Sequence, residues 1–95
     1  MPTTRAAVYA AINGERRYQG KWQKSDSKGE HSFSEWFAYM EDYIDEAQHI
    51  LAREMEQDAY PKVTHIMRKV TAMGVAAMEQ LGAPQRPGYE EDIPF

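Results

Sequence analysis

Apolar residues recur at helical spacing in the first quarter of the chain. Thr3 or Thr4 can cap a helix there, because a side-chain hydroxyl satisfies a backbone N–H that has no partner in the first turn. The helix-spaced residues are Val8, Ala11, Ile12, Glu15, Tyr18 and Trp22. The pattern predicts a helix that ends between Tyr18 and Trp22, weakened at Gly14 by about 1 kcal/mol relative to alanine. The polar residues 24–30 are rich in turn formers and predict a loop.

The second apolar pattern is the longest in the chain. It opens with Ser32-Phe33-Ser34-Glu35, a capping box in which Ser32 and Glu35 satisfy backbone donors reciprocally. The stripe that follows consists of Phe33, Trp36, Phe37, Met40, Tyr43, Ile44, Ala47, Ile50, Leu51 and Met55. Its i, i+3, i+4 spacing predicts an amphipathic helix bounded by Asp58 and Pro61.

A third helix is expected from Lys62 to Leu81. Its apolar face consists of Val63, Ile66, Met67, Val70, Met73, Ala77, Met78 and Leu81. Gly82 is well placed as a C-terminal cap, and the prolines at 84 and 87 prevent further helix. The shared helical phase predicts a core that buries Trp36, Met40, Ile44, Leu51, Ile66, Val70 and Met73.

These elements predict an all-α fold. We expect residues 1–82 to form a three-helix antiparallel bundle, followed by a flexible acidic C-terminal tail over residues 83–95. The second helix is longer and has a wider apolar face than so short a chain can cover. We therefore expect a homo-oligomer, in the simplest case a dimer through the second helix.

Composition narrows the class of protein. Ninety-five residues allow one domain, and the absence of cysteine excludes disulfides and thiolate metal sites. No apolar run approaches the roughly 18 residues of a membrane span, and no signal peptide is apparent, so we expect a cytoplasmic protein without membrane partners. The net charge of −4 argues against direct nucleic-acid binding, although residues 1–30 are locally basic.

The last residues carry a specific motif. The sequence closes with Gly88-Tyr89-Glu90-Glu91-Asp92-Ile93-Pro94-Phe95. This segment resembles the C-terminal tip of bacterial single-stranded-DNA-binding protein (SSB), an acidic run followed by the same four final residues and a free carboxylate. The SSB tip binds exonucleases, helicases and other DNA-maintenance proteins. The resemblance implies that Glu90, Glu91, Asp92, Ile93, Pro94 and Phe95 bind a partner with an SSB-tip pocket. A solubilising acidic tail that folds back on the body is the alternative.

A second resemblance lies in the helical body. The run from Glu15 to Gln19 with Lys21 and Trp22, and later His31 and Trp36 before an acidic helix, is similar to small phage-type proteins related to the all-α MazG pyrophosphohydrolases. Carboxylates on two helices hold Mg²⁺ on a nucleoside triphosphate in that family.

The metal-binding motif of that family is matched here in part. Residues 41–45, with Glu41, Asp42 and Asp45, fit the first acidic helix in charge and spacing. Arg68 and Lys69 stand where the second acidic motif would lie, and these cations would repel Mg²⁺ or pair with Glu41 or Asp45 across the helices.

Three functions follow from these observations. The preferred one is a non-enzymatic, phage-type interaction protein without a cofactor, whose tip docks on a host nuclease or helicase and recruits it or competes with SSB for it. A MazG-like pyrophosphohydrolase that uses Mg²⁺ is the second. The third retains a nucleotide pocket without catalysis and holds phosphates through Arg68 and Lys69. The spacing of His31, His49 and His65 is not that of metal ligands.

Overall fold

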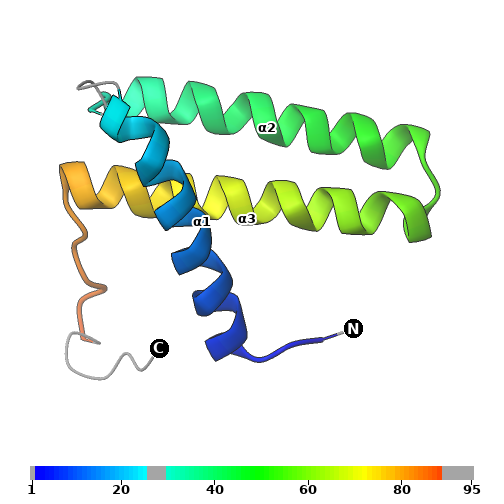
Figure 1. Ribbon diagram of the computed structural model, residues 1–95, viewed down its shortest axis with the longest axis horizontal. Coiled ribbons are helices and arrows are strands. Elements are labelled where there is room, and N and C mark those ends of the chain that lie inside the picture. The colour runs from blue at the N-terminus through cyan, green and yellow to red at the C-terminus, as the bar shows by residue number, and fades with distance from the viewer. Residues whose placement is uncertain (1, 26–29, 89–95) are drawn as a thin grey trace.

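The regular secondary structure in the described part of the chain is helical. The computed structural model describes residues 2–25 and 30–88, and within these ranges it contains three helices and no strand (Figure 1). Helix α1 spans Arg5–Ser25, α2 spans Phe33–Arg53 and α3 spans Glu56–Leu81. The expected end of the first helix between Tyr18 and Trp22 was wrong, because α1 continues through polar residues into the start of the predicted loop. The prediction of an all-helical fold is therefore confirmed. None of these helices combines the length and apolarity required to cross a membrane.

The start of α2 follows the predicted capping box. The Ser32 hydroxyl accepts a hydrogen bond from the Glu35 backbone N–H at 3.2 Å, and the Glu35 carboxylate accepts one from the Ser32 N–H at 2.8 Å. Because the backbone of Ser32 donates to it, the Glu35 carboxylate has a pKa below its ordinary value. The local sequence thus fixes where α2 begins.

The connection between α2 and α3 is shorter than the sequence pattern indicated. Helix α2 ends at Arg53, and α3 begins at Glu56 instead of the expected Lys62. Pro61 therefore lies inside α3, where it cannot donate the backbone hydrogen bond expected one turn back in the helix. The acidic Glu56 and Asp58 in the first turn complement the positive end of the helix dipole and favour the earlier start.

Helices α2 and α3 form an antiparallel hairpin, and α1 crosses α3 steeply (Figure 1). Within the described ranges α1 packs on α3 and makes no packing contact with α2. The expected antiparallel arrangement therefore holds for the hairpin, whereas α1 lies across it. The body measures 40 × 35 × 23 Å, so its smallest dimension is about that of two helix layers.

Small residues of α3 allow α2 to approach closely. One core cluster contains Trp36, Ala76 and Ala77, with Met73 packed against it. The other contains Ile50, Ala59 and Ile66, surrounded by Tyr43, Ala47, Val63 and Val70. Apart from half-buried Ala47, the residues that α2 contributes to these clusters are Trp36, Tyr43 and Ile50, and they follow one another at seven-residue steps.

The predicted core was wrong at two positions. Ile44 and Leu51 are 45% and 46% exposed, because the hairpin contact uses the flank of α2 that carries Tyr43 and Ile50. Trp36 and Ile66 are buried as predicted, and Met40, Val70 and Met73 are half-buried. The apolar stripe of α2 is wider than the hairpin contact, so part of it remains open to solvent.

The chain leaves the body after α3. Gly82 follows the helix with φ of +118°, a conformation that side chains with a Cβ rarely adopt, and its N–H donates to the Met78 carbonyl. Residues 82–88 are all exposed. Residues 89–95 lie outside the described part of the chain.

Replacing Ser32 with alanine should destabilise the protein by about 1 kcal/mol, because the Glu35 N–H loses its acceptor at the helix start. Ser34→Ala is the matched control, since Ser34 is an exposed serine in the same turn outside the capping box. Urea unfolding followed by circular dichroism measures both. Equal loss of stability in the two variants would contradict the capping role of Ser32.

Candidate functional site

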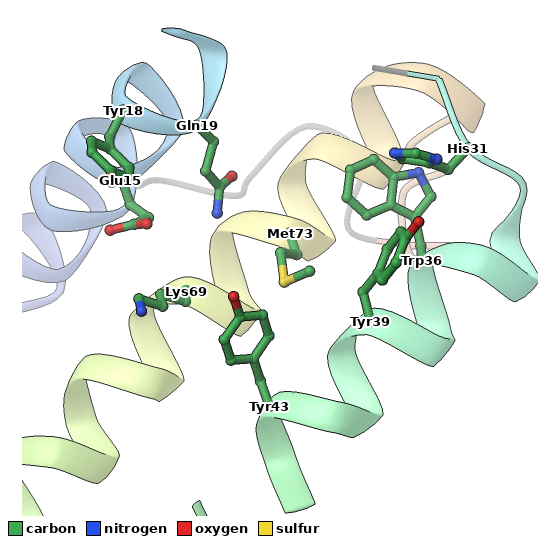
Figure 2. A pocket seen from close by; sticks show the side chains of 9 residues that line it. All are labelled: Glu15, Tyr18, Gln19, His31, Trp36, Tyr39, Tyr43, Lys69 and Met73. Atoms are coloured by element: carbon green, nitrogen blue, oxygen red, sulfur yellow. The ribbon is translucent and has the colours of Figure 1, made fainter. Parts of the chain in front are cut away.

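A groove of about 400 Å³ lies where the C-terminal half of α1 approaches the hairpin (Figure 2). All three helices and the residue before the α2 cap contribute side chains to it. The lining residues are Glu15, Tyr18, Gln19, His31, Trp36, Tyr39, Tyr43, Lys69 and Met73. Aromatic rings thus make up much of a groove that also holds one lysine and one carboxylate.

One end of the groove is a cluster of three rings. The His31 ring packs edge-on against Trp36 and Tyr39, with ring centroids 5.1 and 5.2 Å apart. His31 precedes the Ser32 cap and Trp36 lies four residues beyond that cap, which is the spacing of a hydrophobic staple. That spacing is the sequence signal that would have placed His31 beside Trp36.

Gln80 ties this ring cluster to the end of α3. Its side-chain oxygen accepts hydrogen bonds from the His31 backbone N–H and from the Trp36 ring N–H, both at 3.2 Å. The start of α2 and the end of α3 are therefore held together by polar contacts as well as by packing. This fixes the orientation of the indole that closes the groove.

The floor of the groove belongs to α2 and α3. The Lys69 ammonium lies 5.5 Å from the centre of the Tyr43 ring, within cation–π range, and Met73 lies between Tyr43 and Trp36 (Figure 2). Lys69 is half-buried, and within residues 2–25 and 30–88 no carboxylate forms an ion pair with it. Its charge is therefore positioned beside aromatic faces, an arrangement suited to a ligand that has a flat ring and an anionic group.

The third wall comes from α1 and is held by two charge pairs to α3. Arg68 Nε donates to the Glu15 carboxylate at 2.9 Å, and Arg16 Nη2 donates to Glu79 at 2.6 Å. Glu15 is buried, so its carboxylate depends on the guanidinium of Arg68 for compensation of its lost hydration. These pairs set where α1 crosses α3.

The residues of the predicted nucleotide site are separated by these contacts. The expected pairing of Arg68 or Lys69 with Glu41 or Asp45 was wrong, because Arg68 pairs with Glu15 of α1 and Lys69 lies over Tyr43. Asp45 lies 3.7 Å from His49 on its own helix, and Glu41 is exposed.

Asp42 remains at the edge of the groove. It lines a shallow depression beside Tyr39, Tyr43 and Met73, together with Glu46 of the next turn. In the described ranges no three histidine, aspartate or glutamate side chains gather as metal ligands would. Of the five predicted residues, Lys69 therefore belongs to the aromatic groove and Asp42 to its rim.

The predicted partner-binding residues, Glu90, Glu91, Asp92, Ile93, Pro94 and Phe95, lie outside the described residues. Comparison with known proteins gives no match to a protein-family model, to a curated protein or to a solved structure.

Arg68→Met should destabilise the protein by about 1–3 kcal/mol, because the buried Glu15 carboxylate loses its charged donor. Adding Glu15→Gln to this variant should restore part of the loss, since the amide does not carry the uncompensated charge. Arg17→Met, at an exposed arginine of the same α1 helix, is the control and should change stability little. Urea unfolding of the set at one protein concentration measures the coupling. Strictly additive effects would contradict it.

Proposed function

We propose that this protein is a non-enzymatic interaction protein whose C-terminal segment, Glu90 to Phe95, docks in the SSB-tip pocket of a DNA-maintenance protein. The supporting observation is the sequence Asp92-Ile93-Pro94-Phe95 after two glutamates, which is similar to the SSB tip in residue type and order. The partner is a nuclease or helicase. Docking would recruit it to the helical body or exclude SSB from it, as a phage-type protein would act on a host enzyme.

The chemistry of the segment suits such a pocket. The Phe95 ring would fill an apolar pocket, and in a chain that ends there its α-carboxylate would pair with a cation at the pocket rim. Pro94 restricts its own φ and the conformation of Ile93, so less entropy is lost on docking. The acidic residues before them would speed association with a basic surface.

The described body is compatible with presentation of this segment. Helix α3 ends at Leu81, and residues 82–88 are exposed. From Gly82 to Phe95 the chain could extend up to about 45 Å at about 3.3–3.6 Å per residue, comparable to the longest dimension of the body. The tip could therefore enter a pocket without requiring the body to touch the partner's surface.

The full-length protein should displace a labelled SSB-tip peptide from an exonuclease or helicase that binds this peptide. We expect a Kd of tens of micromolar or weaker, because one buried ring and one charge-assisted bond contribute only about 3–6 kcal/mol before the cost of ordering the tail. Fluorescence anisotropy measures the displacement. Deleting Phe95 should abolish it.

Two controls separate the ring from the carboxylate and the tail from the body. A glycine added after Phe95 keeps the ring but moves the carboxylate, and should weaken displacement strongly. A chain that ends at Gly88 retains all three helices and should not compete. Failure of the full-length protein to displace the peptide from several such enzymes would show that the tail resemblance carries no function.

The groove supports a second candidate function, the binding of a nucleotide without hydrolysis. Lys69 lies beside Tyr43 within a groove lined by further aromatic rings, so a base could stack there while a phosphate meets the ammonium. Arg68, the other cation expected to hold phosphate, is occupied by Glu15. This candidate therefore rests on Lys69 and the rings.

Calorimetry with a panel of nucleoside triphosphates tests the groove. Lys69→Met should weaken binding about tenfold or more through loss of a charge-assisted bond of about 1.5–3 kcal/mol. Lys62→Met is the control, because Lys62 pairs with Glu54 beside the α2–α3 turn. Binding should persist in a metal chelator, and no pyrophosphate should be released. Equal affinities for both lysine variants would remove this candidate.

A further inference from the structure

The hairpin exposes a row of apolar side chains along α2. These residues are Phe33, Phe37, Ile44 and Leu51, each 45% exposed or more. At about 100° per residue they fall within about 40° of one another around the helix axis. The row lies about 100° from the core residues Trp36, Tyr43 and Ile50, so packing against α3 leaves it uncovered.

Helix α3 carries a matching row. Its exposed members are Tyr60, Met67, Met78 and Leu81, and the half-buried Val63 and Gly74 share the same flank. The residues that meet α1 by charge pairs, Arg68 and Glu79, project from a different side of the helix. Most of this row is therefore free of α1, although Met67 also borders the N-terminal half of α1.

The two rows join into one surface. The terminal methyl group of Met40 on α2 lies over Gly74 on α3, where an added Cβ would be in ordinary van der Waals contact with it at 3.6 Å. The two helices therefore meet between the two rows. Tyr39 and Lys69 project from the other flanks of the same two helices into the groove. The hairpin thus has a groove side and an opposite apolar side. We call the latter the open face, and it consists of Phe33, Phe37, Ile44 and Leu51 of α2 with Tyr60, Met67, Gly74 and Met78 of α3.

The open face has the spacing of a helix-bundle interface. Phe37, Ile44 and Leu51 follow one another at seven-residue steps on α2, and so do residues 60, 67, 74 and 81 on α3. A seven-residue repeat is the spacing at which helices pack knobs into holes along their length. The members of the open face are uncharged. Glu41 of α2 would stand at its rim, and Glu56 lies one turn before Tyr60, where the α3 row begins.

The chain is also more extended than a compact domain of its length, in part because residues 82–88 leave the helical body. Its radius of gyration is 15.2 Å, whereas a compact chain of this length has about 12–13 Å. Phe33 and Phe37 stack on each other with ring centroids 6.1 Å apart, although both remain about half exposed. A partner layer on the open face would bury these rings and complete a compact bundle.

We propose that the open face binds the same face of a second copy, forming a symmetric four-helix bundle from two α2–α3 hairpins. Identical copies present apolar rows with the same seven-residue step, so a two-fold axis matches one face to itself. Apart from Glu56 at one end, the face carries no charge that would select a charged partner. The proposal rests on the described body alone and does not depend on the function of the tail.

The size of the face suits a dimer. Helix α2 has 21 residues and therefore runs for about 30 Å, and two helices side by side span about 18–20 Å. Two such faces would bury about 1,200 Å² in projection, at the lower limit of stable specific interfaces, and the roughness of the side chains adds to this. The charge pairs of Arg68 and Glu79 with α1 lie on a different side of α3 from the open face, and α1 borders this face at Met67.

Sedimentation equilibrium on the full-length chain tests the proposal. The wild type should have twice the 11.0 kDa mass of one chain, and the dimer should persist in about 1 M NaCl because apolar contacts are not screened. Ile44→Glu places one carboxylate from each copy in the interface and should weaken dimerisation at least about a hundredfold. Tyr39→Glu is the matched control, since Tyr39 has nearly the same exposure, 42%, on the groove side of α2.

Two further measurements keep the test decisive if Ile44→Glu fails to fold. Met67→Glu changes the α3 row at a residue that is 61% exposed and should also yield monomers. The melting temperature of the wild type should rise with protein concentration, as it does for a dimer that dissociates on unfolding. A wild type that is monomeric at every concentration, or a Tyr39→Glu variant that dissociates as readily as Ile44→Glu, would overturn the proposal.

Discussion

Helix α3 carries the packing of the whole body, because α1 and α2 both pack on it and, in the described ranges, not on each other. It meets α2 mainly through apolar and small residues such as Ile66 and Ala77. It meets α1 through the charge pairs of Arg68 and Glu79 and around the buried Ile12. Because α1 and α2 pack on different sides of α3, both flat sides of the α2–α3 hairpin are left partly uncovered. The groove lies on one of these sides, and the open face forms the other.

The sequence predicted the elements better than their arrangement. The capping box at Ser32 and the glycine at 82 are local signals, and both mark helix ends in the structure. Pro61 made the predicted start of α3 too late, because a proline usually marks the end of a helix or lies in its first turn. Near the start of a helix, however, it removes only one backbone hydrogen bond. The acidic first turn and the short connection after Arg53 outweigh that loss.

The burial of Ile44 and Leu51 could not be decided by periodicity. The stripe of α2 is wide enough to face two partners, and helical phase alone does not show which flank meets α3. The small side chains of α3 decide which flank of α2 is buried. Ala77 gives room for Trp36, and Ala59 gives room for Ile50 and Tyr43. Ile44 and Leu51 then lie on the flank where a second layer would belong.

The candidate site depends on contacts between distant parts of the chain, which explains why the sequence foresaw it only in part. Lys69 was singled out for its charge, but its place among aromatic rings depends on how α2 packs against α3. The sequence pattern offers Glu41 or Asp45 of α2, or a phosphate, as the partner of Arg68, whereas the crossing of α1 brings Glu15 to it from 53 positions away. A long-range ion pair of this kind leaves no local pattern in the sequence.

The proposed dimer and the proposed tail would reinforce each other physically. One tip binds weakly, because a single ring and carboxylate must offset the ordering of the tail. Two hairpins joined through their open faces would carry two tails on one rigid bundle. Once the first tip has docked, the second would search a volume limited by its tail, so a partner with two pockets would be held far more tightly than one tip allows. By joining two chains, the open face would then set the apparent affinity of the tails for such a partner.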